Sequence, residues 1–251
     1  MHSFHFLSFE GLSIFEQLQI EEALFRADNR NWCLVNHGTS PAIVMGISGK
    51  QSQHINSEQM IQKPIPVIRR FSGGGTVVVD EQTLFYTLIG NRSILDFPCY
   101  PDELLRWTEK LYAPAFAGIN FSLRDNDYII KDRKFGGNAQ YISKDRWLHH
   151  SSLLWDYNAN MMKYLLMPPK MPAYRNLREH SSFLCRLSDH FGSSDLIKTK
   201  MIEALQSKLT LVPTSLAEIK PLFERDYRRF TKLINGHSDA ADTEKSGSSK
   251  D

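Results

Sequence analysis

The chain has 251 residues, 41% hydrophobic and 23% charged, so it is long enough to bury a substantial core and has an ordinary globular composition. Its formal net charge of +2 is too balanced to indicate nucleic-acid binding, and no apolar stretch is long enough to span a membrane. Three well-separated cysteines outside any metal-ligand spacing, and an N-terminus without secretory features, favour a soluble cytoplasmic protein, with an organellar matrix as the alternative.

The first half of the chain is expected to alternate helices and strands. Ser13 and Glu16 have the spacing of a capping box, which predicts a helix over residues 14–27. A short polar helix is expected near residues 56–62. Runs rich in β-branched and aromatic residues predict strands over residues 31–35, 41–47, 66–68, 76–79 and 83–89.

The second half is expected to extend the sheet and then to become helical. Residues 127–130 and 134–142 are predicted to form a hairpin, and residues 147–155 a further strand. Helices are predicted over residues 102–115, 194–207 and 215–233.

These elements predict an α/β (α+β) fold, a mixed β-sheet flanked by helices, in one domain over residues 1–234. Residues 235–251 are predicted to be a disordered tail, because the end of the chain lacks large apolar residues. Residues 237–251 carry four acidic residues and two lysines, a net charge of −2, which leaves +4 on the rest of the chain. That excess mildly favours acidic partners.

Residues 69–75 read Arg-Arg-Phe-Ser-Gly-Gly-Gly and lie between two predicted strands. Three glycines forfeit side-chain packing but expose amide N–H groups beside two guanidinium groups, which suits a phosphate or a carboxylate. Alternation along a strand points Arg69 and Arg70 to opposite faces, and we expect Arg70, next to the turn, to face the ligand. A flexible hairpin tip with two solvated arginines is the alternative. Neither a Walker loop nor a dinucleotide fingerprint is present.

A second cationic, glycine-lined segment spans residues 126–140. Lys134 would supply a compact positive charge there, while Gly136 and Gly137 let a ligand approach the backbone. A surface lysine after a hairpin turn is the alternative. His149 and His150 follow on a predicted strand and should face opposite ways, so we do not expect them to chelate one metal ion together. We expect one histidine to be packed and the other to lie at a pocket rim.

Together these segments resemble the lipoate–protein ligase family, which is related to the biotin–protein ligases. The family pattern Arg-Arg-x-Ser-Gly-Gly-Gly-x-Val matches residues 69–77, its Asn-Asp and Lys-x-x-Gly-x-Ala-Gln pattern matches residues 126–140, and its His-His-Gly-x-Leu-Leu pattern matches residues 149–154. The usual His-Asp after the loop is Val79-Asp80 here, and Ser151 replaces a glycine. The chain after the last motif is short, as in the shorter ligases of plants and some bacteria.

The resemblance implies a catalytic domain that activates lipoate with ATP and Mg²⁺. Lipoyl-adenylate would form with release of pyrophosphate, and a lysine of an acceptor protein would then attack the mixed anhydride. The implied acceptors are the lipoyl domains of 2-oxoacid dehydrogenase complexes or the H protein of glycine cleavage. A separate accessory protein for adenylation is a further implied partner.

The matched positions also imply site roles. Lys134 would be the catalytic residue, contacting the acyl carbonyl and the phosphate; Asp127 would lie near the adenine or the acceptor lysine, and His149 near the apolar tunnel for the lipoyl chain. The residues implied to bind substrate are Arg70, Ser72, Gly73, Gly74, Gly75, Asp127, Gly137, Ala139 and His149. Those implied to bind ATP are Asn126, Thr76 and Val77. No side chain is assigned to a metal ion.

Two other functions are compatible with the sequence. An octanoyl or lipoyl transferase of the same fold would need no ATP, and Cys185 is its one candidate nucleophile after the motifs, with Arg186 and His180 nearby to lower its pKa. A non-catalytic lipoyl-binding relative would account for the altered His-Asp pair and the short C-terminal part. The intact Arg69-Arg70 pair and Lys134 favour the ligase.

Overall fold

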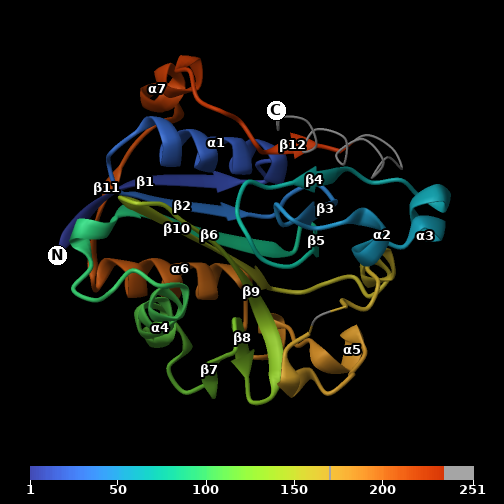
Figure 1. Ribbon diagram of the computed structural model, residues 1–251. Helices are drawn as coiled ribbons and strands as arrows, with labels where there is room; N and C mark the ends of the chain where they lie inside the picture. The colour runs from blue at the N-terminus through green and yellow to red at the C-terminus, as the bar shows by residue number, and fades with distance from the viewer. Residues whose placement is uncertain (170, 235–251) are drawn as a thin grey trace, which may run out of the picture.

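A computed structural model describes residues 1–169 and 171–234, so the prediction of a disordered tail over residues 235–251 lies outside the described residues. Two mixed sheets form the framework (Figure 1). In the larger sheet β1 runs parallel to β2 and β11, and the other neighbours are antiparallel. Its strands in spatial order are β11 (Leu209–Pro213), β1 (His2–Glu10), β2 (Trp32–His37), β6 (Thr83–Asn91), β10 (Arg146–Leu154), β9 (Arg133–Ile142), β8 (Asp127–Ile130) and β7 (Phe121–Arg124).

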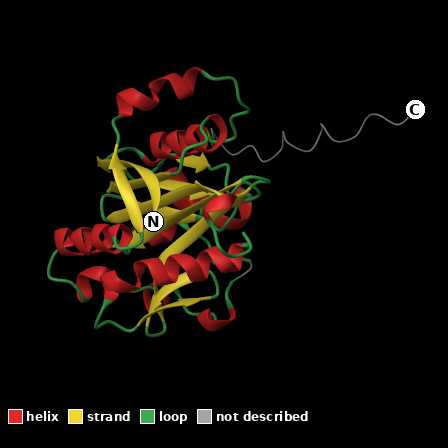
Figure 2. Cartoon of the chain, turned by 90° about the vertical axis from the view of Figure 1, so that its left-hand side faces the viewer, coloured by secondary structure: helices red, strands yellow, loops and turns green. Residues whose placement is uncertain are grey.

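Helices cover both faces of the larger sheet, because its strands carry apolar side chains on both sides (Figures 1 and 2). Helix α1 (Ile14–Ala27) packs on one face, and α4 (Pro101–Tyr112) and α6 (Ser194–Gln206) pack on the other. Strand β6 illustrates the alternation: Tyr86 joins the cluster under α4 and α6, and Ile89 joins the cluster under α1. We call these the α4/α6 face and the α1 face.

The smaller sheet carries the glycine-rich segment. Its strands in spatial order are β12 (Lys232–Leu233), β4 (Val67–Arg69), β3 (Ala42–Met45) and β5 (Val77–Val79). Because β3 lies between β4 and β5, the glycines do not close a hairpin, as the sequence had suggested, but cross over the end of β3. Two strand spacings, about 10 Å, separate the ends that this segment joins.

The remaining described helices are short. They are α2 (Gln51–His54), α3 (Ser57–Gln62), α5 (His180–Phe183) and α7 (Leu216–Ile219), with 3₁₀ turns η1 (Arg92–Ile94), η2 (Ala113–Phe116), η3 (Met161–Tyr164), η4 (Ala173–Arg175), η5 (Leu187–Asp189) and η6 (Lys220–Glu224).

Most predicted elements are confirmed. Helix α1 begins after Ser13, whose hydroxyl oxygen accepts from the Glu16 amide at 3.2 Å and donates to the Glu16 carboxylate at 2.6 Å. Helices α3, α4 and α6, strand β10 and the β8–β9 hairpin lie where they were expected. The strands predicted over residues 31–35 and 41–47 are present as β2 and β3, but they belong to different sheets.

The helix predicted over residues 215–233 is wrong. Only α7 and η6 form there, and the chain then runs extended into β12. Pro221 cannot continue an α-helix, and the buried Glu22 carboxylate accepts the amides of Phe230 and Thr231, both at 2.9 Å. Strands β1, β7, β11 and β12 were not predicted; β7, β11 and β12 are sheet edges.

Candidate active site

The glycine loop, residues 70–76, is held by close backbone approaches at the end of β3. The Arg70 amide donates to Met45 O at 2.9 Å. Gly74 has a φ of +110°, and a Cβ at Gly46 would lie 2.2 Å from the Gly74 carbonyl oxygen. Glycine is therefore required at both positions, since a side chain at Gly46 would displace the loop.

The two arginines point in different directions, as alternation predicts, but each bonds to backbone. Arg69 donates to carbonyls of the segment 47–49. Arg70 is 4% exposed, and its Nη2 donates to the carbonyl oxygens of Gly73 and Gly75, both at 2.9 Å. The Arg70 guanidinium thus lies beneath the loop, and the expectation that it faces the ligand stays a prediction. Burial lowers its pKa to about 10, so it stays charged at neutral pH.

Donor groups of the loop are left open. Gly74 and Gly75 are exposed residues, and their amides donate to no residue in the described part of the chain. The Thr76 hydroxyl is buried and has no hydrogen-bond partner among residues 1–169 and 171–234. Buried hydroxyls are normally paired, so this cradle fits an anionic oxygen or phosphate.

Strand β9 packs beside the loop and carries the predicted lysine. The Gly73 amide donates to Gln140 O at 3.2 Å. Lys134 Nζ lies 2.7 Å from Asp127 Oδ1, with side chains 23% and 12% exposed. A Cβ at Gly137 would come within 3.2 Å of Lys134 Nζ, so the glycine leaves the lysine room to lie along the strand. The structure therefore brings loop, lysine and carboxylate to one region.

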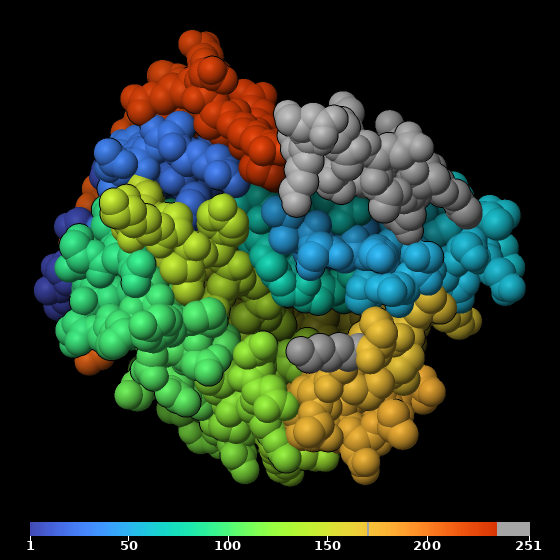
Figure 3. All heavy atoms as spheres, in the orientation of Figure 1, coloured from blue at the N-terminus to red at the C-terminus, as the bar shows by residue number. Residues whose placement is uncertain are grey.

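The surface of the molecule is hollowed beside the part of the chain that carries the loop. Figure 3 shows the surface hollowed between the light-blue and teal part of the chain, which includes the loop, and the yellow-orange part after β10.

The two histidines of β10 lie on opposite faces of the sheet, as predicted. The register pairs Ser152 with Gly137, so His150 shares the face of Gly137 and Ala139, and His149 faces the other way. Both are buried, at 0% and 7% exposure, so neither lies at a pocket rim. His149 is therefore on the α4/α6 face, opposite to the face of Gly137, and its implied place near the lipoyl tunnel stays a prediction.

His150 instead joins a buried polar cluster under the loop that the sequence reading missed. Glu21 Oε1 lies 2.9 Å from His150 Nδ1 and accepts hydrogen bonds from the Thr87 hydroxyl and the Gln17 amide, both at 2.8 Å. The Glu21 carboxylate also favours the charged form of Arg70. In the sequence, the i, i+4 spacing of Gln17 and Glu21 on an otherwise apolar helix face was the one pattern that could have indicated this cluster.

Because His149 is buried, it is expected to make the free energy of unfolding depend on pH rather than to act as a catalytic acid. Its pKa is lowered to about 3 by burial, with a smaller contribution from the charge of His150. An unfolded histidine titrates near pH 6.5, so between about pH 6.5 and 3 the unfolded chain binds the proton and the folded chain does not. The contribution of His149 to the free energy of unfolding should therefore fall by about 1.4 kcal/mol per pH unit as pH decreases through this window.

Urea unfolding at pH 7 and pH 5 measures this effect. His149→Gln keeps polar groups for Tyr128 and Gln140, the neighbours of the ring. We expect the variant to lose about 2 kcal/mol less than the wild type between these two pH values. Equal losses in the two proteins would show that His149 does not set the slope.

Asn126 and Val77 are the other two residues predicted to bind ATP. Asn126 is at the β7–β8 turn and lines a cavity of about 480 Å³ with Asp102, Leu105, Arg106, Leu123 and Asp125. Val77 is partly buried and packs against the cluster around Ile14 and Leu18.

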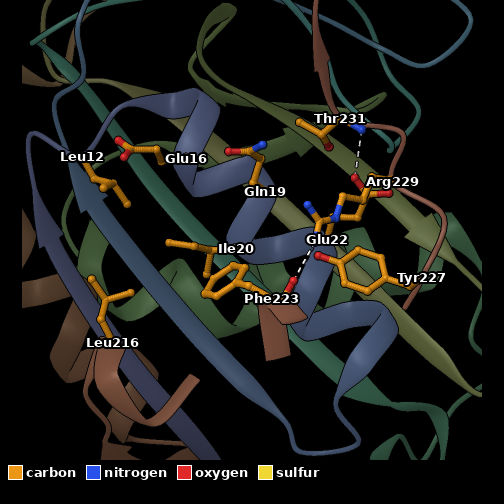
Figure 4. A pocket seen from close by; sticks show the side chains of 10 residues that line it. All are labelled: Leu12, Glu16, Gln19, Ile20, Glu22, Leu216, Phe223, Tyr227, Arg229 and Thr231. Carbon is orange, nitrogen blue, oxygen red and sulfur yellow. Dashed lines mark hydrogen bonds between the residues drawn. The ribbon is translucent and has the colours of Figure 1, made fainter. Parts of the chain in front are cut away.

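Another cavity, of about 310 Å³, lies between α1 and the chain after Leu216 (Figure 4). Its lining residues are Leu12, Glu16, Gln19, Ile20, Glu22, Leu216, Phe223, Tyr227, Arg229 and Thr231. None belongs to the glycine loop, β8 or β9, so we do not assign this cavity to the site around Lys134.

Residues 1–169 and 171–234 include no group of three His, Cys, Asp or Glu side chains suited to a metal ion. In the same residues, no helix has the length and apolar character needed to cross a bilayer.

Comparison with known proteins matches this chain in sequence and in fold. The family model described as the lipoyl protein ligase A/B catalytic domain matches residues 13–210. The inactive lipoate–protein ligase 2 of Plasmodium falciparum is 28% identical over 241 residues, which cover 72% of this chain and 62% of that protein. The lipoate–protein ligase LplJ of Bacillus subtilis is 28% identical over 144 residues, covering 55% and 42%. The chain thus matches less than two thirds of either relative's length.

Solved structures share the fold. The bipartite lipoate protein ligase of Thermoplasma acidophilum, described with its E2 lipoyl domain, has a TM-score of 0.75 at 15% identity and covers 89% of this chain and 91% of its own. Lipoate–protein ligase A bound with ATP scores 0.73, and protein Ta0514 of T. acidophilum with bound lipoic acid scores 0.70. Both are 15% identical and cover 89% of this chain, with 93% and 94% of their own chains matched.

Proposed function

The chain belongs to the lipoyl protein ligase A/B catalytic-domain family, and from this premise we propose that it is a lipoate–protein ligase. It activates lipoate with ATP and transfers the lipoyl group to a lysine of an acceptor lipoyl domain, with residues 1–234 acting as one catalytic domain. The observation that carries the proposal is the Lys134–Asp127 pair, 2.7 Å apart, with Lys134 on the strand that packs against a loop with open amides. Neighbours described with ATP and with lipoic acid support the choice of substrates.

In the first half-reaction a carboxylate oxygen of lipoate attacks the α-phosphorus of ATP, and the bond to pyrophosphate breaks. Negative charge develops on the phosphoryl oxygens. The Lys134 ammonium and the amides of Gly74 and Gly75 are the donors for that charge, and the buried Arg70 adds a fixed positive charge beneath them. Mg²⁺ that enters with ATP would bind mainly through the phosphates of ATP. The use of Mg²⁺ stays a prediction.

In the second half-reaction the neutral amine of the acceptor lysine attacks the acyl carbon. The C–N bond forms, AMP leaves with the electron pair of the broken bond, and the amine releases a proton. Lipoyl domains of 2-oxoacid dehydrogenase complexes, or the H protein of glycine cleavage, are the proposed acceptors. The neighbour described with its E2 lipoyl domain supports this class of partner.

Lipoate-dependent exchange of labelled pyrophosphate into ATP, with the purified full chain alone, tests the proposal. Exchange supports the ligase. Exchange that requires an added second protein supports a ligase with an accessory partner. No exchange under either condition, with octanoyl transfer from a carrier protein, would replace the ligase by the transferase.

The transferase that uses Cys185 receives no support from the geometry. Its thiol is buried, donates to Arg133 O at 3.3 Å, and has its pKa raised to about 11 by burial. A thiol in this state is a poor nucleophile at neutral pH. We expect Cys185→Ser, which keeps a donor for Arg133 O, to retain ligase activity within about twofold. Loss of acyl transfer with normal circular dichroism would restore Cys185 as a candidate.

A second function, lipoyl binding without chemistry, is favoured by one observation: the Plasmodium relative is named as inactive. Binding of a non-hydrolysable lipoyl-adenylate analogue, measured by calorimetry, separates this function from the ligase. A binder would take up the analogue but exchange no pyrophosphate, with or without added proteins.

A further inference from the structure

Asp127 is shared between two partners. Its Oδ1 lies 2.7 Å from Lys134 Nζ, and its Oδ2 accepts a hydrogen bond from the Tyr174 hydroxyl at 2.9 Å. Tyr174 lies well beyond the last sequence motif, and no site role was predicted for it. The three side chains form a continuous chain from the buried tyrosine to the ammonium group.

Packing on several sides keeps the Tyr174 hydroxyl at this place. Tyr174 is 8% exposed, and its ring centroid lies 5.3 Å from the ring centroid of Phe183. The guanidinium carbon of Arg124 lies 4.8 Å from the Tyr174 ring centroid. Burial, together with the neighbouring Asp127 charge, raises the pKa of the phenol. The hydroxyl therefore remains a proton donor to the carboxylate at neutral pH.

The backbone around Tyr174 is tied to the β8–β9 hairpin. Arg178 donates to the Asp132 carboxylate and carbonyl and to Tyr174 O, at 2.9, 2.9 and 3.0 Å. The Cys185 amide donates to Lys134 O at 2.8 Å. The tyrosine and the lysine are thus fixed against the same hairpin, so their separation is set by the fold rather than by a mobile loop.

This arrangement matters when Lys134 turns toward a ligand. The lysine then leaves Asp127, and a mostly buried carboxylate would lose its partner, which is costly. A hydrogen bond from Tyr174 stabilises the carboxylate in that state and withdraws some of its charge in the resting state. Without it, Asp127 would hold the ammonium more tightly and away from the ligand.

We infer that Tyr174 is a positioning residue, an inference that rests on the proposed function. Tyr174 shares Asp127, the counter-ion of Lys134, and so leaves Lys134 free to contact the acyl-phosphate. Removing the Tyr174 hydroxyl should slow lipoyl-adenylate formation, in which charge develops on the phosphate, without weakening lipoate binding. A hydrogen bond to a charged group corresponds to about tenfold or more in rate.

Tyr174→Phe tests this inference because it keeps the ring contacts to Phe183 and Arg124. We expect kcat for lipoyl-adenylate formation to fall about tenfold, with the KM for lipoate within about twofold of wild type and the Tm little changed. Tyr157→Phe is the matched control, since Tyr157 packs against the same cluster as Tyr174 but has no place in the chain to Lys134. It should keep wild-type kinetics.

A double-mutant cycle with Asp127→Asn gives the second readout. The neutral amide no longer holds the ammonium by charge, so adding Tyr174→Phe should change kcat less than about twofold in that background. Independent, multiplying effects would overturn the inference, as would a Tyr174→Phe variant with wild-type kcat or with only a lowered Tm. A wild type that neither forms the adenylate nor binds its analogue would remove the proposed function, and the inference with it.

Discussion

Lys134→Ala is expected to reduce lipoyl-adenylate formation by about 10²–10³-fold. The substitution removes the ammonium group beside the open loop amides, and loss of one preorganised donor at a developing charge costs about that much. The Asp127 carboxylate keeps its hydrogen bond from Tyr174, so the fold should persist. Single-turnover formation of labelled lipoyl-adenylate measures the effect, and circular dichroism verifies the fold.

Lys144→Ala is the matched control for this variant. Lys144 is exposed at the turn between β9 and β10, the opposite end of β9 from Lys134, so its removal should leave the rate unchanged. If Lys134→Ala formed the adenylate as fast as Lys144→Ala, Lys134 would have no part in the chemistry.

Gly74→Ala is expected to disrupt the glycine loop. Gly74 has a φ of +110°, and a Cβ there would lie 2.6 Å from Arg70 Nη2 and 3.3 Å from Asn138 O. The alanine is strained and displaces the guanidinium from the loop carbonyls, which should lower the free energy of unfolding by about 1–3 kcal/mol. We expect affinity for a lipoyl-adenylate analogue to fall at least tenfold, measured by calorimetry.

Gly75→Ala separates ligand contact from loop damage. No heavy atom lies within 4 Å of a Cβ at Gly75, so the loop itself tolerates the methyl group. If the ligand lies on the loop backbone, this variant should keep the wild-type Tm and still bind the analogue more weakly. Gly192→Ala, which also meets nothing within 4 Å, should be neutral in both measurements. Wild-type affinity in Gly75→Ala would place the ligand elsewhere.

The elements near the site were largely predictable from local patterns. The cap at Ser13, the apolar stripe of α1 and the turn signals of the β8–β9 hairpin depend on residues close in sequence, and each element formed as expected. The helix prediction for the segment after Ser215 was wrong because that segment depends on residues far away in sequence. Its conformation depends on the Glu22 carboxylate and on the free edge of β4, which a local pattern does not reveal.

The site shows the same division. Lys134 and Asp127 were proposed from their motif and lie together. His149 was proposed from its motif as well, yet the sheet register places it on the α4/α6 face. Arg70 was expected to face the ligand, and only the tertiary structure shows that its guanidinium lies beneath the loop, where the carbonyl oxygens of Gly73 and Gly75 accept its hydrogen bonds.

By itself, the amino-acid sequence determined the family, and it predicted the cationic glycine-lined site with Lys134 as its catalytic residue, because these depend on residue type and short spacing. The tertiary structure alone decided that β3 separates β4 from β5, that His150 rather than His149 shares the face of Gly137, and that Tyr174 reaches Asp127. Strand order, register and contacts between distant segments are set by long-range packing, which residue spacing along the chain does not encode.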